Sequence, residues 1–374
     1  MADVIIHWFR RDLRLEDNTA WSAALATSSE VLPVYFLDDR ILEQPTIGAP
    51  RLRFLRTALR SLDAQLRQRG SALLVRRSGD VPRDLNRLVE ESGAWSVYCN
   101  RDYTPYARAR DQRATRGLQM TGIVTQTFAD SLMVEPYATA GGDGNPALDF
   151  DTYRERWLDA VDVAAEAPRA RGKLVAAAGQ PPGIDGWQGP WAAEVAQDST
   201  WPGATPVSAR QRLRRFVAED LRRGGGTTLS AALNHGTISA RQVARALVAA
   251  GSDETVREAV EAVLDSLSRR DFAYQLAFTR PELLMPPPGE PPLAYEVWRT
   301  AATGDTVVDT SMRRLEEIGW LPHAERLRAA AFLVDSSGGN WRAGAAHYMR
   351  RLVDADVVLN AFGWREAAAA HALR

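Results

Sequence analysis

The sequence predicts two domains: an α/β domain with a doubly wound parallel sheet, followed by an all-α domain. Over about the first 130 residues, short apolar runs alternate with amphipathic helical segments, the pattern of a parallel sheet covered by helices. From residue 207 onward, apolar residues recur at helical spacing, except in a proline-rich loop at 286–292. We therefore expect a first domain over residues 1–135, a connector over 136–206 and a helical domain over 207–374.

Five strands are predicted in the first domain, and the apolar run at 31–37 is short enough for a buried parallel strand. They span residues 4–9, 31–37, 72–75, 96–99 and 124–128. Helices are predicted to begin near Asn18 and to span residues 51–70, 84–92 and 108–120. Polar residues follow the first, second and fourth strands at the edge where open α/β sheets bind ligands. No GxGxxG or Walker-type loop is present, which argues against a classical dinucleotide site there.

Composition and cysteine content narrow the class of protein and its expected location. The chain is 45% hydrophobic and 25% charged, as is typical of a soluble globular protein, and it has no apolar run long enough to cross a membrane. The N-terminus is predicted to be a strand and not a signal peptide, and the single cysteine, Cys99, excludes an internal disulfide framework or a cysteine-built zinc site. We expect a cytoplasmic protein with no metal and no membrane partner. The sequence does not indicate an oligomeric state.

The net charge of −1 argues against a surface coated with basic residues for nucleic acid. Residues 205–245 are locally basic, with eight arginines against Glu219 and Asp220. Such a stretch is either a phosphate-facing patch or a solvated helical face, and we favour the solvated face.

Residues 304–364 form a helical region interrupted at Gly319-Trp320, at 336–339 and near residue 354. Charged and amide groups lie here among positions that are expected to be buried: Arg326, Arg328, Asp354, Asp356 and Asn360. Because buried charge is costly unless it is paired or binds a ligand, these groups indicate a polar pocket between helices. The alternative is a helical core with a few satisfied polar residues, which the periodicity alone favours.

Several motifs resemble the photolyase/cryptochrome family. The opening string HWFRRDLRLEDN at 7–18 is the most specific, and NRDYTPY at 100–106 and Phe150…Tyr153…Trp157 are similar to the same domain of that family. In the second domain the similar segments are 227–239, 308–320, 340–342 and 354–364. The resemblance covers nearly the whole chain in order. It implies an α/β doubly wound antenna domain joined to an all-α C-terminal domain of the FAD-binding type, with an unidentified antenna chromophore.

The resemblance also implies which residues hold FAD. Thr227, Thr228 and Ser230 match the hydroxyl clamp on the pyrophosphate, although one residue of that clamp is deleted and its usual Pro-Tyr is Ala231-Ala232. The positions implied to surround the isoalloxazine and ribityl chain are Arg270, Arg328, Asp354 and Asp356, and Asn360 matches the residue that faces flavin N5. A buried Arg–Asp pair there is expected to offset an anionic flavin. The turn 321–325 replaces a shorter segment that supplies an Asn in the family.

Trp364 and Trp341 match the inner two members of the family's electron-transfer chain. The outer position falls in 286–292, which has no tryptophan, so photoreduction through that chain is expected to be impaired. The alternative is that two buried tryptophans in helices belong only to the core.

The substrate side departs furthest from the family pattern. Ser266 and Arg269 occupy the places of a Glu and a Trp that contact a flipped pyrimidine dimer, and only ten residues follow Trp364, where the family has a terminal helical segment. His323, in the altered turn, and Arg269 are candidate acid/base groups, whereas His235 and His347 are expected to be structural.

Three functions remain open at this point. We favour a photolyase-like enzyme repurposed for a non-standard, small-molecule substrate. The first alternative is a light-dependent deoxyribodipyrimidine lyase that uses reduced FAD, with weakened contacts to DNA. The second is a cryptochrome-like blue-light sensor.

Overall fold

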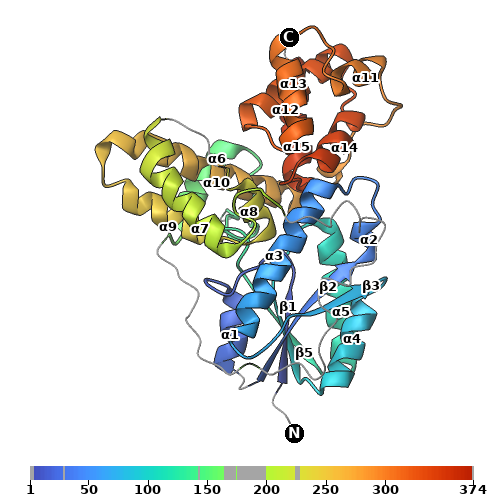
Figure 1. Ribbon diagram of the computed structural model, residues 1–374, viewed down its shortest axis with the longest axis vertical. Helices are drawn as coiled ribbons and strands as arrows, with labels where there is room; N and C mark the ends of the chain where they lie inside the picture. Colours follow the sequence, from blue (N-terminus) through green and yellow to red (C-terminus); the bar gives the residue numbers. More distant parts are fainter. Residues whose placement is uncertain are drawn as a thin grey trace.

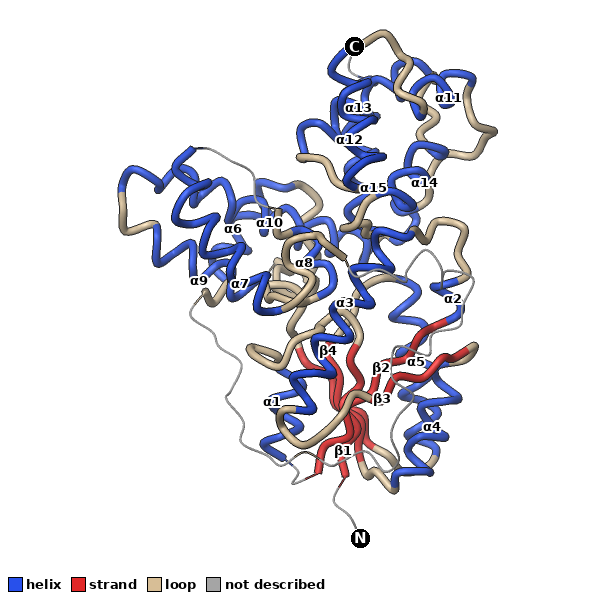
Figure 2. Tube along the Cα trace, in the orientation of Figure 1, coloured by secondary structure: helices blue, strands red, loops and turns tan. Residues whose placement is uncertain are grey.

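The computed structural model describes residues 4–27, 30–141, 144–163, 174, 199–223 and 228–372 of the 374-residue chain. A sheet with flanking helices forms one part, and two helical lobes form the rest (Figures 1 and 2). No helix within the described ranges is long and apolar enough to cross a membrane.

The five predicted strands form one parallel sheet in the order β3-β2-β1-β4-β5, so the doubly wound α/β prediction is confirmed. The strands are β1 (Val4–Phe9), β2 (Glu30–Asp38), β3 (Leu74–Ser78), β4 (Ser96–Asn100) and β5 (Val124–Phe128). From β1 the chain adds β2 and β3 on one side, and it then adds β4 and β5 on the other side. The topological switch point of the sheet therefore lies between β1 and β4.

Helices cover both faces of the sheet, and alternate residues of β1 serve the two faces. Ile5 and Phe9 pack with α3 (Ala49–Arg67) and α1 (Thr19–Thr27), whereas Ile6 packs with residues of the opposite layer. That layer is formed by α4 (Val81–Ser92) and α5 (Pro105–Met120), and a short α2 (Asp39–Leu42) follows β2. Figure 1 shows α1 and α3 on one side and α4 and α5 on the other.

The third strand is displaced from its predicted range of 72–75. β3 is an edge strand that pairs only with β2, and its second half carries Arg76 and Arg77, whose side chains reach Glu91 and Asp39. An edge strand does not need a continuous apolar run, so the apolar pattern ends before the strand does.

Part of the predicted connector is helical. α6 (Phe150–Ala160) buries Tyr153 and Trp157 in the same core cluster as α7 (Pro206–Arg215). In the proline- and glycine-rich stretch 169–206, the structure describes only residues 174 and 199–206. α7 begins at Pro206, and Thr205 and Ser208 form a capping box at its start.

The first helical lobe has its own core, and so has the second. The first lobe contains α6, α7, a π-helical turn (Phe216–Asp220), 3-10 turns at Leu221–Arg223 and Glu254–Val256, α8 (Ser230–His235), α9 (Ala240–Ala250) and α10 (Arg257–Thr279). The second contains α11 (Leu293–Arg299), α12 (Thr306–Ile318), α13 (His323–Ser336), α14 (Arg342–Arg351) and α15 (Val357–Ala372), after a 3-10 turn at Pro281–Leu284. The breaks predicted in 304–364 coincide with the ends of α12, α13 and α14.

The first domain and the first lobe approach each other closely at Gly236, which ends α8 with a positive φ of 70°. A Cβ at this position would lie 2.1 Å from the carbonyl oxygen of Arg11, so no larger residue fits without a shift of the backbone. The backbone N–H of Leu13 donates to the carbonyl of His235 in the same junction.

The arginines of 205–245 are largely engaged with acidic residues of this chain. The pairs are Arg210–Glu16, Arg212–Asp220, Arg215–Glu219, Arg222–Asp253, Arg241–Asp130 and Arg245–Asp17. Three of them (with Glu16, Asp17 and Asp130) join the first domain to the helical part. These arginines are therefore mainly paired within the chain or solvated, and they do not form a free phosphate-binding patch.

Candidate functional site

A polar centre lies in the second lobe near its junction with the first lobe. Arg326 of α13 donates from Nη2 to Asp354 Oδ2 over 2.8 Å, and it also donates from Nε to the Leu321 carbonyl. Asp354 is 7% exposed, and its other oxygen, Oδ1, is buried with no protein partner among the described residues. A buried carboxylate oxygen without a donor is costly, so this position fits a ligand that carries an N–H or O–H group.

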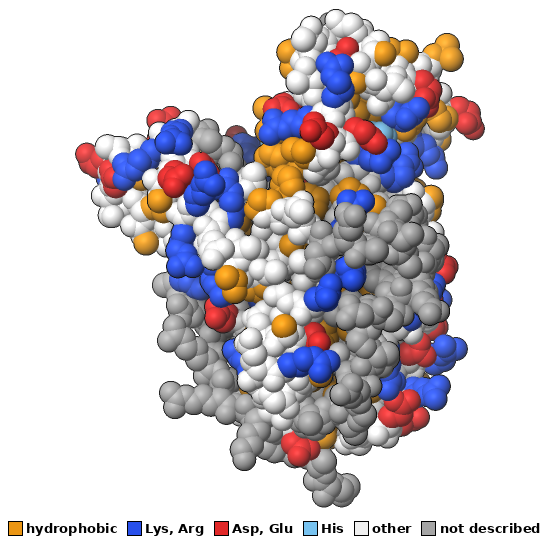
Figure 3. Space-filling model, viewed as in Figure 1, with side chains coloured by type: hydrophobic (Ala, Val, Ile, Leu, Met, Phe, Trp, Pro, Cys, Tyr) orange, Lys and Arg blue, Asp and Glu red, His pale blue; other side chains and the backbone are white. Residues whose placement is uncertain are grey.

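A hydroxyl of the first lobe lies beside this centre. Ser230, the first residue of α8, accepts a hydrogen bond of 3.1 Å from Trp320 Nε1, and Arg326 lies 5.9 Å from the Trp320 ring. Thr228 accepts a 2.5 Å hydrogen bond from Arg212 Nε. Thr227, the third member of the predicted clamp, lies outside the described residues. Figure 3 shows hydrophobic side chains gathered where the two lobes meet.

Helix α15 carries the amide and indole groups. Asn360 donates from Nδ2 to the Ala345 carbonyl over 3.1 Å, and Trp364 follows one helical turn later. The Trp364 and Trp341 rings stack with centroids 6.4 Å apart and planes inclined by 14°. Trp298 packs against the same Trp364 ring at 6.0 Å. The two tryptophans that were predicted from the resemblance thus adjoin each other inside the second lobe.

Two other predicted cofactor residues lie at the domain junction. Both carboxylate oxygens of Asp356 accept hydrogen bonds from protein donors, including Arg11 Nη2 and the Tyr274 hydroxyl at 2.5 Å each. Burial opposes ionisation of Asp356, but the Arg11 charge and these hydrogen bonds outweigh it and hold the pKa of Asp356 below its ordinary value. Arg270 of α10 donates to the Ser131 carbonyl over 2.9 Å.

The remaining predicted residues lie on the surface. Arg328 is on the outer side of α13, where it pairs with Asp305 with its side chain 57% exposed, so the buried Arg–Asp pair is made by Arg326 instead. The His323 side chain is 72% exposed and lies 4.0 Å from the Glu366 carboxylate. Arg269 is 62% exposed and stacks 3.9 Å over Phe150.

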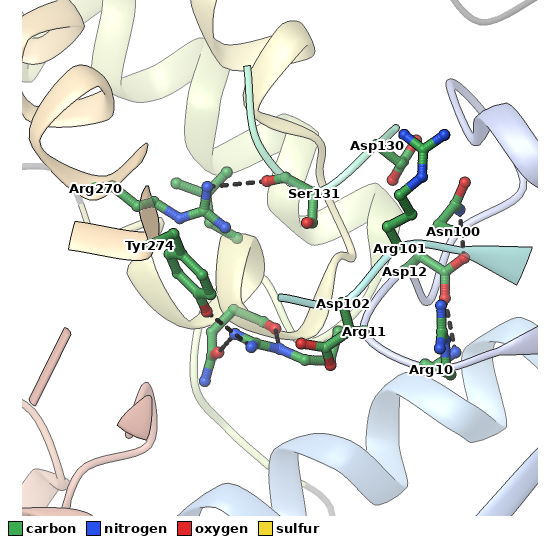
Figure 4. Close-up of a pocket in the computed structure, with 12 residues that line it drawn as sticks. Arg10, Arg11, Asp12, Asn100, Arg101, Asp102, Asp130, Ser131, Arg270 and Tyr274 are labelled. Atoms are coloured by element: carbon green, nitrogen blue, oxygen red, sulfur yellow. Dashed lines mark hydrogen bonds between the residues drawn. The ribbon is translucent and has the colours of Figure 1, made fainter. Parts of the chain in front are cut away.

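A second polar pocket lies between the first domain and the first lobe, at the β1/β4 switch point (Figure 4). It encloses about 380 Å³ including its open mouth. Its charged lining is balanced between arginines and aspartates: Arg10, Arg11, Arg101, Arg270, Asp12, Asp102 and Asp130. Arg10 Nη2 is buried there without a partner among the described residues, although its Nη1 pairs with Asp111.

Sequence reasoning gave no role to Arg11 or Tyr274, and it placed Arg326 in a polar pocket without giving it a partner. Arg326 had a detectable signal, since it lies among apolar residues of a helical pattern. Arg11 follows the first strand at the ligand-binding edge of the sheet, so its location was predictable but its partner was not. Tyr274 gave no signal, because an aromatic residue in a helix is ordinarily core. No three His, Cys, Asp or Glu side chains in the described part of the chain gather closely enough to hold a metal ion.

A doubly wound α/β domain followed by two helical lobes around a buried Arg–Asp pair defines a two-domain cofactor-binding protein. Two family models match the chain. The model described as DNA photolyase matches residues 5–171, and the model described as the FAD binding domain of DNA photolyase matches residues 263–373. The deoxyribodipyrimidine photo-lyase of Synechococcus sp. is 31% identical over 98% of this chain and 81% of its own length. The chain belongs to the photolyase/cryptochrome family.

Solved structures agree with this assignment. A bacterial class III photolyase from Agrobacterium tumefaciens has a TM-score of 0.86 at 26% identity, covering 98% of this chain and 80% of its own. An archaeal photolyase from Sulfolobus tokodaii, solved with two FAD molecules, has a TM-score of 0.81 at 25% identity, covering 98% of this chain and 83% of its own.

FAD is therefore the cofactor of the helical domain, as the resemblance implied. The residues fit this group on their own chemistry. Asp354 Oδ1 is an unpartnered acceptor among the described residues, Arg326 carries a positive charge beside it, and the Ser230 hydroxyl is of the kind that binds phosphate oxygens.

Proposed function

We propose that the protein is a light-dependent flavoprotein of the photolyase type, which transfers one electron from reduced FAD to a lesion in DNA. The observation that carries the proposal is the stacked Trp364–Trp341 pair, one turn from Asn360 on α15. A buried pair of parallel indoles next to a flavin site offers a route for the electron that reduces the cofactor. When it is bound, FAD supplies the absorption of blue light and the one-electron chemistry.

The residues of the chain have separate tasks in this proposal. Ser230 and Thr228 present hydroxyls to the phosphates, and Asp354 accepts a hydrogen bond through Oδ1. Arg326 pairs with Asp354 and balances negative charge that develops on the ring. The Asn360 amide, held by the Ala345 carbonyl, presents its remaining polar atom to the reactive edge of the ring.

DNA is the proposed substrate because the named relative acts on a deoxyribodipyrimidine, and because Arg269 and Arg154 lie near each other on an exposed face, both paired with Asp265. Base stacking on a guanidinium is compatible with an extruded nucleotide.

The cytoplasmic location also remains a prediction from the sequence.

A second candidate is a small-molecule reaction at the same site, which was our favoured prediction. One observation favours it: Ser266 donates to the Ala262 carbonyl of its own helix, and Arg269 is tied to Asp265 and Phe150, so neither side chain reproduces a carboxylate–indole pair. No relative named above supports a small-molecule substrate, so this candidate ranks second.

One preparation tests both candidates. The purified protein is loaded with FAD and illuminated without oxygen in the presence of a thiol, and flavin reduction is followed by absorbance. A dimer-containing oligonucleotide is then added. We expect reduction that is slow because residues 286–292 lack the outer tryptophan, together with light-dependent repair and DNA binding that weakens steeply with salt. Trp364→Phe should block flavin reduction while FAD stays bound. Arg328→Met is the matched control, and it should leave both flavin reduction and FAD binding unchanged.

Reduction without repair, together with DNA binding that is absent or insensitive to salt, would exclude the DNA lyase and leave the small-molecule or light-sensing role. Failure to bind FAD at all would overturn the proposed function as a whole.

A further inference from the structure

Asp356 is the point where three parts of the molecule meet. Its Oδ2 accepts from Arg11 Nη2, which belongs to the first domain, and from the Tyr274 hydroxyl of α10 in the first lobe. Its Oδ1 accepts from the backbone N–H groups of Val358 and Leu359 at 2.9 Å each, which caps α15 in the second lobe. The side chain is 2% exposed.

These four donors occupy the carboxylate fully. An ionised carboxylate has about four lone-pair sites in total. Asp354, two residues earlier, offers the contrast, because only its Oδ2 is engaged and its Oδ1 has no partner among the described residues. Of the two aspartates that were predicted to hold FAD, only Asp354 has an acceptor to offer.

Arg11 is equally committed to this junction. Its Nη1 donates to the Tyr274 hydroxyl over 2.8 Å, its Nε donates to the Asn234 carbonyl over 3.1 Å, and its Nη2 also donates to Asn234 Oδ1. Asn234 donates in turn to the Ala355 carbonyl over 3.0 Å, immediately before Asp356. Figure 4 shows Arg11 directed toward the end of the Tyr274 side chain.

We infer that Arg11 is a positioning residue for the flavin site, and that Asp356 is the group through which it acts and not a ligand of the cofactor. By fixing the first turn of α15, the Arg11–Asp356 pair sets the axial position and rotation of the helix. Asn360 lies one turn further along α15 and Trp364 two turns, so both groups depend on this anchor. The first domain is thereby a structural part of the flavin site.

This inference rests on the proposed function only in its use of FAD affinity as a readout. The variants are Arg11→Met, Asp356→Asn and the double variant. The matched control is Arg108→Met, because Arg108 also joins the first domain to α10, by donating to the Phe278 carbonyl over 2.9 Å and stacking over that ring, but has no contact with Asp356. Two measurements are made on each: the dissociation constant of FAD, and hydrogen exchange of the Val358 and Leu359 amides in the FAD-free protein.

We expect Arg11→Met and Asp356→Asn each to weaken FAD binding by about tenfold to a hundredfold, the effect of losing a hydrogen bond to a charged group. The double variant should lose little more, because both substitutions break one unit. Exchange at Val358 and Leu359 should accelerate in both single variants, and Arg108→Met should match the wild type in both measurements.

The inference is overturned if Arg11→Met binds FAD within about twofold of the wild type while Asp356→Asn loses affinity, since Asp356 would then contact the cofactor directly. If Arg11→Met does not fold, Arg11→Lys keeps the charge but removes the planar fork, and it should show the same two changes to a smaller degree. If no protein binds FAD, the proposed function fails, and hydrogen exchange alone decides whether Arg11 anchors α15.

Discussion

Gly344 lies in α14 where that helix packs against α15, and it tests the placement of the indole pair. A Cβ at this position would lie 2.3 Å from Trp364 Cη2 and 2.7 Å from Leu333 Cδ2. Carbon atoms in contact prefer about 3.5–4.0 Å, so Gly344→Ala must move the Trp364 ring or the helix by about 1 Å. Overpacking of this kind costs about 1–3 kcal/mol, and the better helix propensity of alanine offsets up to about 1 kcal/mol of it.

The matched control is Gly363→Ala in α15, because a Cβ there would have no atom within 4 Å. That variant should gain up to about 1 kcal/mol from helix propensity alone. Urea unfolding of both FAD-free proteins, followed by near-UV circular dichroism of the tryptophans, gives the comparison. We expect Gly344→Ala to be less stable than Gly363→Ala by about 2 kcal/mol. Equal stabilities, with unchanged tryptophan signals, would show that α14 and α15 do not pack at this distance.

Three further outcomes follow from named contacts. Arg326→Met leaves a buried carboxylate unpaired and should destabilise the protein by about 3 kcal/mol in urea unfolding, whereas Arg328→Met, which removes an exposed pair, should change it by less than about 0.5 kcal/mol. Trp341→Phe should slow light-driven flavin reduction less than Trp364→Phe does, as measured by absorbance after a light pulse. Burial, and then the Arg10 charge, lower the pKa of His7 to about 3, so the unfolded chain takes up a proton between pH 6.5 and 3 that the folded chain does not. Stability is then lost as pH falls through this range at up to about 1.4 kcal/mol per pH unit, and His7→Leu should reduce the loss between pH 7 and 5.

Most of the fold was predictable because its elements follow local rules. Buried parallel strands need continuous apolar runs, and β1, β2 and β4 were predicted to within two residues for that reason. β5 is a largely exposed edge strand, and its range was also predicted correctly. β3 was displaced because an edge strand tolerates Arg76 and Arg77, and α6 was assigned to a connector because its flanking turns obscure a helix of 11 residues. The predictions were weakest where pairing, and not periodicity, determines structure.

The residues of the site could be predicted from sequence motifs only where the position of a residue in the motif also determines which way its side chain faces. Arg328 was expected beside the flavin, with Arg270, Asp354 and Asp356, because it matches the family motif by position. In the structure, α13 begins at His323, Arg326 faces the buried side and Arg328 faces outward. The two arginines are two residues apart, which is about 200° of helix, so they lie on opposite faces of α13. A motif match does not show which of the two arginines is on the buried face, but the structure does.

Asp354 and Asp356 show why residue identity alone does not define a ligand. Both are buried aspartates in one turn before α15, and both match cofactor positions of the family. What separates them is the number of donors that the described residues provide: one hydrogen bond for Asp354, and four for Asp356. A carboxylate that the protein has saturated contributes to rigidity, whereas a carboxylate with an unpartnered oxygen makes binding of a donor favourable. The counting requires Arg11 and Tyr274, which lie 345 and 82 residues away in the sequence, so it becomes possible only in the folded chain.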